Sequence, residues 1–378
     1  MKNFLFTSCI ATLAAGAASA GGVERSNQST AILFEKGDVV QVALTSAQAD
    51  ISGVETEFGP TPGAESGNMT PAYLQYSAAY KADINDRVSY ALIVDQPYGA
   101  NVAYSPDTNY YGAGINATLD AEAVTALIKV TSPKHFSVFG GLRQQSLAAN
   151  AYLPLPGGDS YSANGAEDWG TGWVAGVAWE KPEIAARVAL TVNSEIEHEL
   201  VTNEFGSITY MGASIDFDET NPTPVTTPRS INLEFQTGIA QDTLLFGSVR
   251  KVEWGTFEIT PFVYEFGSEG ESLVQFPGDT VTYNLGIGRR ITDRFSVALN
   301  GSYEAPYGGF TSNLGPVDGR TSYGIAATYD MDRVQVAGGI QFVDMGDAQT
   351  SLDSTNPTAD FTGNSGLGAG IRVTFKLP

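Results

Sequence analysis

The sequence has little cysteine and no second long apolar run. Cys9 is the only cysteine among 378 residues, which excludes a framework of internal disulfides. Beyond the N-terminus, no apolar run approaches the ~20 residues that a membrane-spanning helix needs. No glycine-rich loop lies between a strand pattern and a helix pattern, so nucleotide chemistry has no support.

Basic residues are scarce relative to acidic ones. The chain has 20 Lys and Arg against 42 Asp and Glu, and charged residues make up only 16% of it. A chain this negative repels the phosphates of nucleic acid, so we expect no nucleic-acid partner. The same balance does not suit a protein that binds membrane surfaces through basic patches.

The N-terminus has the pattern of a secretory signal peptide. Lys2 precedes the apolar residues 4–18, and an Ala-Ser-Ala cleavage site follows. We predict a signal peptide over residues 1–20 and a mature chain without cysteine. The alternative is a lipoprotein modified at Cys9, which the short segment before it disfavours. Secretion with neither disulfides nor free thiols is typical of the bacterial envelope.

Glycine and aromatic residues are abundant, with 42 Gly, 17 Tyr and 19 Phe. Apolar and polar residues alternate with period two, which predicts an all-β chain. In the last such segment, Leu367 and Ile371 share one face and Arg372 lies on the other. We predict fourteen strands, over residues 38–50, 71–83, 86–96, 117–131, 135–147, 169–180, 184–198, 230–240, 242–254, 280–290, 294–304, 321–330, 333–343 and 367–377.

The predicted connections alternate strictly between long and short. The long ones cover residues 51–70, 97–116, 148–168, 199–229, 255–279, 305–320 and 344–366. All long loops therefore emerge at one end, which is typical of an outer-membrane barrel with apolar faces toward lipid and polar faces toward the lumen. A soluble sandwich has no reason to sort its loops in this way. We predict a fourteen-stranded antiparallel transmembrane β-barrel over residues 37–378.

The third predicted strand is interrupted in mid-course. Pro97 cannot donate a ladder hydrogen bond, and Gly99 marks a bend or a close backbone approach. One interpretation is a kink that opens the barrel wall, and the other is the first turn of the external loop before Tyr110. For the kink, the candidate portal residues are Val94, Asp95, Gln96, Pro97, Tyr98 and Gly99.

The fourth strand, residues 117–131, changes phase. Its apolar residues carry odd numbers up to Ala123 and even numbers from Val124 onward. A change of one residue predicts either a β-bulge or a strand that begins later than proposed.

His198 lies in the only cluster of histidine with carboxylates. Strand spacing puts Glu197 and Glu199 on one face and His198 on the other, and no HExxH spacing is present. We interpret the cluster as a solvated strand end, and predict no metal ligands, no cofactor and no catalytic residues.

Four charges are expected on lumen faces: Glu234, Arg290, Arg333 and Arg372. An arginine there would attract a ligand carboxylate. The alternative, which we favour, is that these charges pair with one another inside the barrel.

Three segments resemble the FadL-type outer-membrane transporters of long-chain fatty acids and hydrocarbons. Residues 80–99, with Pro97-Tyr98-Gly99, are similar to the periplasmic turn and third strand of that family. Residues 227–254 resemble its paired strands eight and nine, and residues 366–377 resemble its closing strand. The likeness spans nearly the whole barrel, although its motifs are short.

This resemblance implies a fourteen-stranded barrel with an N-terminal plug in its lumen, an apolar pocket and a lateral exit at the third strand. The plug would be residues 21–36, through Val23, Ile32, Leu33 and Phe34; a short helix there or a loose arm both fit the residues. The segment is much shorter than the family's plug, and Ser29-Thr30-Ala31 stands where the family has Asn-Pro-Ala. The C-terminal Lys376-Leu377-Pro378 lacks the terminal aromatic residue preferred for barrel assembly.

We therefore expect passive, non-enzymatic transport of long-chain fatty acids or other hydrophobic compounds across a Gram-negative outer membrane. The partners would be the hydrophobic ligand, outer-membrane lipid and lipopolysaccharide, and the barrel would be a monomer. A general water-filled porin is the alternative and predicts ion conductance. An envelope hydrolase is a third possibility and predicts that His198→Ala abolishes an activity.

Overall fold

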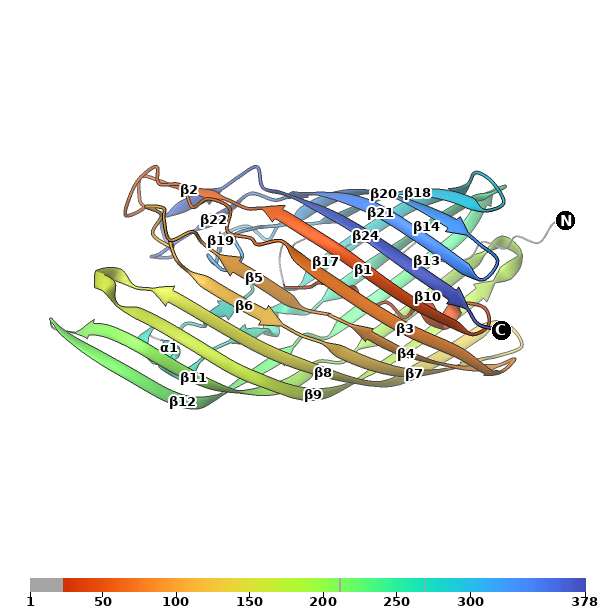
Figure 1. Cartoon of the computed structure of the whole chain (residues 1–378), viewed down its shortest axis with the longest axis horizontal. Coiled ribbons are helices and arrows are strands. Elements are labelled where there is room, and N and C mark those ends of the chain that lie inside the picture. Colours follow the sequence, from red (N-terminus) through yellow and green to blue (C-terminus); the bar gives the residue numbers. More distant parts are fainter. Residues whose placement is uncertain (1–22, 211, 269) are drawn as a thin grey trace.

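A closed antiparallel β-barrel makes up most of the chain, as the computed structural model in Figure 1 shows. The structure describes residues 23–378 except 211 and 269. The predicted signal peptide, residues 1–20, lies outside the described residues, as do the first two residues of the predicted plug. The barrel sheet has 18 strands, and four wall strands are each interrupted once, so fourteen strands cross the wall as predicted.

Ten wall strands are continuous, and four consist of two parts each. The continuous strands are β1 (Val39–Asp50), β3 (Tyr73–Asn85), β8 (Phe136–Pro154), β9 (Ser160–Lys181), β14 (Thr243–Val252), β17 (Thr280–Arg290), β18 (Phe295–Glu304), β20 (Arg320–Asp330), β21 (Val334–Met345) and β24 (Ser365–Lys376). The interrupted strands are β4 (Val88–Asp95) with β5 (Gly99–Ala103), β6 (Asn116–Asp120) with β7 (Ala123–Thr131), β10 (Ala186–Asn193) with β11 (Ile196–Tyr210), and β12 (Ala213–Thr227) with β13 (Ser230–Ala240).

The first and last wall strands close the barrel. β1 pairs with β24 in an antiparallel register from Val39↔Lys376 to Asp50↔Ser365. Closure leaves no free sheet edge along this seam, so the backbone groups of both strands are satisfied there.

The outer face of the barrel is apolar and the inner face is largely polar. Exposed outward side chains include Leu142, Val138, Leu285, Leu299, Ile340, Leu367 and Ile371. Arg372 and Thr374, at the alternate positions of β24, are buried inside. This distribution is the reverse of a soluble sandwich and confirms the predicted faces. No helix among the described residues is long and apolar enough to cross a membrane.

Two predicted loops, residues 148–168 and 199–229, are wrong, because most of their described residues lie in long β-hairpins instead. β8 pairs with β9 as far as Pro154↔Ser160, and β11 pairs with β12 from Ile196↔Thr227 to Tyr210↔Ala213. Both hairpins project beyond the other strands in the lower left of Figure 1. Polar residues on both faces and two prolines in β12 gave no strand signal. β11 is the only described strand that pairs with β12, and prolines are tolerated on such an edge.

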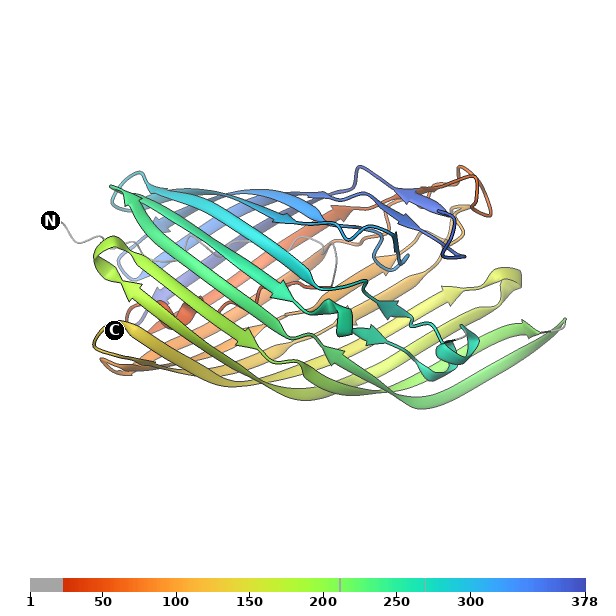
Figure 2. The same cartoon turned by 180° about the vertical axis from the view of Figure 1, so that it is seen from behind.

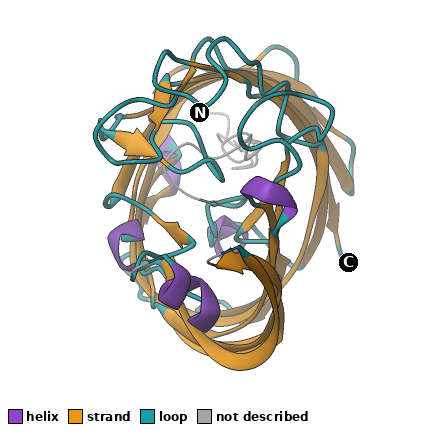
Figure 3. Cartoon of the chain, turned by 90° about the vertical axis from the view of Figure 1, so that its left-hand side faces the viewer, coloured by secondary structure: helices purple, strands orange, loops and turns teal. Residues whose placement is uncertain are grey.

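The remaining short elements lie at the end of the barrel with the long connections. They are the strands β2 (Gly53–Glu55), β15 (Glu258–Ile259), β16 (Val274–Gln275), β19 (Phe310–Thr311), β22 (Ala348–Thr350) and β23 (Ala359–Phe361), and the helices η3 (Pro156–Gly158), η5 (Trp254–Thr256) and α1 (Phe262–Gly267). The helix η4 (Pro182–Ile184) forms a short turn at the other end. Figure 3 looks into the barrel and shows loops and short helices over the ring of strands.

A tyrosine cluster fixes one of these loops to another. The rings of Tyr104 and Tyr110 stack with centroids 5.4 Å apart. Tyr104 Oη donates to the carbonyl of Asn313 at 2.8 Å, and Tyr110 Oη donates to Asn313 Oδ1 at 2.7 Å. Burial raises the pKa of both tyrosines above its ordinary value, so the hydroxyls stay protonated and able to donate. The loop with Asn313 is thereby held over the barrel mouth.

The described N-terminal residues run inside the barrel rather than outside it. The helix η2 (Ala31–Phe34) buries Ile32, Leu33 and Phe34 against lumen side chains that include Ile93, Leu127 and Phe139. The ring of Phe34 meets that of Phe139 edge-on at 5.9 Å. Of the two possibilities that the sequence left open, a short helix is present and a loose arm is not.

Candidate functional site

The third wall strand breaks at Gln96, Pro97 and Tyr98, between β4 and β5. β4 pairs with β3 up to Ala78↔Val94. Beyond the break, β5 pairs with β6 and has no register with β3. Residues 73–77 of β3 therefore have a strand partner on the β1 side only. The result is a gap in the wall between β3 and β5, and because the strand resumes at Gly99 it is not the start of the external loop.

Side chains and the N-terminal segment occupy the hydrogen-bonding groups that the break releases. Tyr76 N donates to Gln96 Oε1 at 3.1 Å in place of a ladder bond. Arg25 N donates to the Pro97 carbonyl at 2.8 Å, and Gly99 N donates to the Val23 carbonyl at 2.8 Å. At the break, the backbone of the third wall strand therefore forms hydrogen bonds with the N-terminal segment inside the barrel rather than with β3.

The six predicted portal residues all lie at this break. Asp95 is buried and accepts a hydrogen bond from Ser26 Oγ at 2.6 Å. Tyr98 points across the lumen: its hydroxyl accepts from Gln28 Nε2 at 3.0 Å, and its ring meets Trp254 at 5.6 Å. Val94 and Gln96 are half-buried, and Pro97 and Gly99 are buried.

The fourth strand keeps one phase, so the predicted shift is wrong. Leu119, Ala121 and Ala123 are all buried, and the inward positions continue on odd numbers through β7. What changes is the outer face, where Asp120 and Glu122 replace the apolar residues found further along β7. A register irregularity is present instead in the ladder between β8 and β9, where Leu147 pairs with Asp168 and Ala149 pairs with Gly165.

A cavity of about 660 Å³ reaches both sides of the gap. Tyr73 lines it from β3, and Gly99 and Ala100 line it from β5. Its far wall is formed within residues 257–261 and 272–277, which Figure 2 shows in teal on the side of the barrel away from β5 and β6. The volume lies within the range of small-molecule sites.

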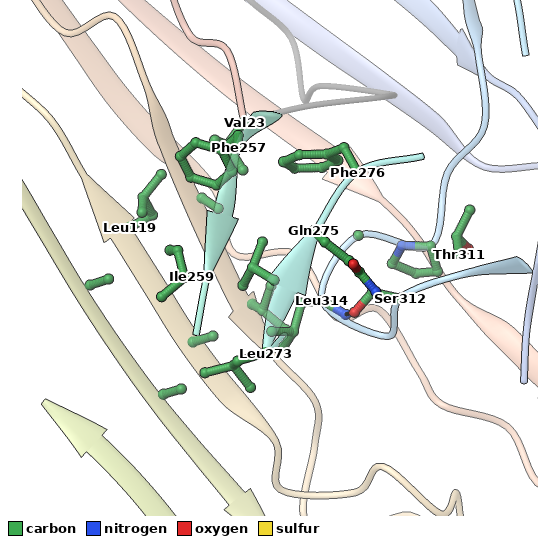
Figure 4. A pocket seen from close by; sticks show the side chains of 18 of the residues that line it. Val23, Leu119, Phe257, Ile259, Leu273, Gln275, Phe276, Thr311, Ser312 and Leu314 are labelled. Atoms are coloured by element: carbon green, nitrogen blue, oxygen red, sulfur yellow. Dashed lines mark hydrogen bonds between the residues drawn. The ribbon is translucent and has the colours of Figure 1, made fainter. Parts of the chain in front are cut away.

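Apolar side chains dominate this cavity, as Figure 4 shows. Val23 lies beside Phe257, and Phe276 lies opposite. The aliphatic side chains around the same space are those of Leu119, Ile259, Leu273 and Leu314. Such a lining favours hydrocarbon over a hydrated solute.

Between the cavity and the end of the barrel with the short turns, the N-terminal segment is anchored to the lumen wall. Glu24 forms a buried ion pair with Arg250, in which Arg250 Nε donates to Oε1 at 2.9 Å. Further along, Ser29 Oγ donates to Glu234 at 3.2 Å. The cations of Lys129 and Arg187 each lie 4.7 Å from the ring of Phe34.

The four predicted lumen charges have different environments. Glu234 contacts the N-terminal segment, and Arg372 is buried inside β24. Arg290 is half-buried at the end of β17. Arg333 does not lie in a strand: it is exposed in the turn before β21, because that strand begins one residue later than predicted. The Glu24–Arg250 pair was not predicted, because Glu24 lies in the N-terminal segment and Arg250 lies more than two hundred residues later in β14.

His198 faces the lumen, and Glu197 and Glu199 face outward, as strand spacing predicted. Its Nδ1 lies 3.6 Å from Asp168, and its Nε2 lies 3.3 Å from the amide nitrogen of Gln145. The histidine therefore has an acidic neighbour from β9 rather than from its own sequence cluster. The interpretation as a solvated strand end is wrong, because His198 is buried and lies within β11.

No protein-family model and no curated protein matches the sequence. The fold, in contrast, is similar to solved structures. A FadL homologue of Pseudomonas aeruginosa superposes with a TM-score of 0.75 at 16% identity, over 97% of this chain and 98% of that chain. The toluene transporter TodX of Pseudomonas putida gives a TM-score of 0.67 at 11% identity, over 96% of each chain.

The toluene transporter TbuX of Ralstonia pickettii gives a TM-score of 0.61 at 13% identity, over 90% of each chain. All three likenesses cover nine tenths or more of both chains, so they include the barrel and its external elements. The chain therefore has the fold of the FadL-type barrels, with fourteen antiparallel strands around an N-terminal segment.

Proposed function

We propose that this chain transports hydrophobic compounds passively across a Gram-negative outer membrane and releases them sideways through the gap between β3 and β5. The observation that carries the proposal is the cavity, which is apolar and is lined from both sides of the gap by Tyr73, Gly99 and Ala100. A ligand that leaves there enters hydrocarbon directly and never crosses water.

The N-terminal segment obstructs the lumen between the cavity and the end of the barrel with the short turns, which favours a lateral exit over an axial one. The side chains of Ile32, Leu33 and Phe34 pack against lumen side chains that include Leu127 and Phe139. Burying a large apolar side chain contributes roughly 1.5–3 kcal/mol, so opening this cluster to a passing ligand is costly. We assign residues 23–36 the role of a plug.

Long-chain fatty acids and hydrocarbons are the proposed cargo. Aliphatic and aromatic side chains make up most of the cavity surface, with polar groups in the minority. The solved structures with the same fold are named as a FadL homologue and as toluene transporters. No covalent chemistry is part of the proposal.

Expression in Gram-negative cells that lack their own transporter for hydrophobic compounds tests this function. We expect uptake of radiolabelled oleate to rise with the protein, while uptake of a hydrophilic sugar stays at the background rate. Ala149→Trp, which fills the cavity, is expected to lower oleate uptake. Ala175→Trp, on the exposed outer face of β9, is the matched control and is expected to leave it unchanged. Sugar uptake without oleate uptake would instead support a water-filled porin.

A further inference from the structure

The cation of Arg25 lies where the cavity meets the gap between β3 and β5. Arg25 is 6% exposed, and its guanidinium carbon lies 4.5 Å from the ring centroid of Tyr73 on β3. On the other side of the gap, a Cβ added to Gly99 would lie 2.3 Å from the same guanidinium carbon. The arginine therefore fills the space between β3 and β5, and only glycine at position 99 leaves room for it.

Arg25 is also the only cation among the described residues that line the cavity. The one acid in that lining is Asp318, whose carboxylate accepts hydrogen bonds from Tyr307 N and Gly308 N at 2.7 Å each. Asp318 is thus engaged with its own loop. A ligand in the cavity meets a single charge that faces it, and that charge is positive.

Two nitrogens of the Arg25 guanidinium have no hydrogen-bond acceptor among the described residues. Within the described part of the chain, its Nε and Nη2 are buried and have no hydrogen-bond acceptor. Its Nη1 lies 3.6 Å from Asp120 Oδ1, and the Asp120 side chain is 64% exposed. An ion pair of that length and exposure contributes little, so it exchanges easily for a better acceptor. A buried donor without an acceptor is costly, which favours a ligand that supplies one.

We propose that Arg25 determines the specificity of the transport route: it binds the carboxylate of a long-chain anionic amphiphile at the gap, in place of Asp120. This inference rests on the function proposed above and narrows its cargo. A carboxylate fits the side of the guanidinium that carries Nε and Nη2, because its two oxygens accept parallel hydrogen bonds from these two nitrogens. A neutral hydrocarbon cannot supply these acceptors, although it fits the apolar lining equally well.

The contact between Arg25 and the ligand carboxylate would also couple ligand binding to opening of the gap between β3 and β5. Arg25 occupies the gap while it faces Asp120 and Tyr73, so a ligand that draws the guanidinium into the cavity also clears the space between β3 and β5. Carboxylated ligands would then open the wall that neutral ligands leave closed.

Binding of radiolabelled oleate and oleyl alcohol to the purified full-length protein tests this proposal, because the two probes share one chain and differ in the carboxylate. We expect the wild type to bind oleate at least about tenfold more tightly, the factor that a difference of ~1.4 kcal/mol gives. Arg25→Gln is expected to remove this preference by weakening oleate alone. Acidification that protonates the carboxyl of oleate is expected to do the same in the wild type.

Two further variants separate recognition from structure. Asp120→Asn removes the competing acid at an exposed site, and we expect it to tighten oleate binding roughly twofold to fivefold without changing binding of the alcohol. Arg229→Gln removes an exposed cation that pairs with Glu253 at 3.3 Å, and it is the control expected to change neither ligand.

Equal binding of the two probes by the wild type would overturn the role of Arg25, as would an Arg25→Gln variant that weakens both equally. In those cases the transport function stands. Failure of the wild type to bind either probe would overturn the transport function as well, so the two failures are distinguishable.

Discussion

Deleting residues 23–36 is expected to convert a closed barrel into an ion-conducting pore. Fourteen strands enclose more space than side chains of the wall alone can fill. In this chain the N-terminal segment fills part of it, with Leu33 fully buried and Phe34 between two cations. Without the segment, polar lumen residues such as Thr191 and Asn232, which now contact it, would face water.

Planar-bilayer recording measures this effect. We expect no stepwise openings for the wild type and resolved openings for the deletion variant. Heat-dependent migration on gels checks that the shortened barrel is folded. Open steps in the wild type would show that the segment does not close the lumen and would support the porin alternative.

Replacing Arg250 by methionine is expected to release the N-terminal segment from the wall. Arg250 is buried and donates to Glu24 through Nε and Nη2. Removing one partner of a buried ion pair typically costs 3–5 kcal/mol, because the other charge loses its compensation. The barrel wall does not depend on this pair. The lost free energy therefore destabilises the contact of residues 23–26 with Pro97 and Gly99.

Hydrogen exchange resolves this local effect. The amides of Arg25, Ser26 and Gly99 donate within the junction, and we expect their protection to fall by a hundredfold or more, as ~3 kcal/mol implies. Arg250→Gln combined with Glu24→Gln removes both charges and is expected to recover part of the protection. Unchanged protection in Arg250→Met would mean that the ion pair does not hold the segment.

The barrel was predictable from the sequence because lipid on one side and a polar lumen on the other impose period two on each strand. Leu367, Ile371 and Arg372 show this in β24, and the structure confirms their faces. The same logic failed outside the lipid-facing region. Most side chains of β12 are exposed on both faces and the strand carries Pro222 and Pro224, so its sequence shows no alternation of apolar and polar residues. The strand forms because β12 pairs with β11 along its whole length.

The break in the third strand was partly predictable. Pro97 and Gly99 signal a missing hydrogen bond wherever they lie in a strand. What replaces the bond was not predictable, because Val23 and Arg25 are separated from it by more than seventy residues. Their roles depend on where the segment threads through the lumen, and only the three-dimensional arrangement brings Arg25 between Tyr73 and Gly99.

Photocrosslinking during transport can show whether ligand leaves through the wall between β3 and β5. A fatty acid with a photoreactive group near the end of its chain is supplied to cells, irradiated, and located on the protein by mass spectrometry. We predict labels in residues 73–77 of β3 and in β5, with none around Phe34 and Phe139. Labels on Phe34 and Phe139 without labels at the gap would rule out the lateral exit, because they would show an axial path through the plug.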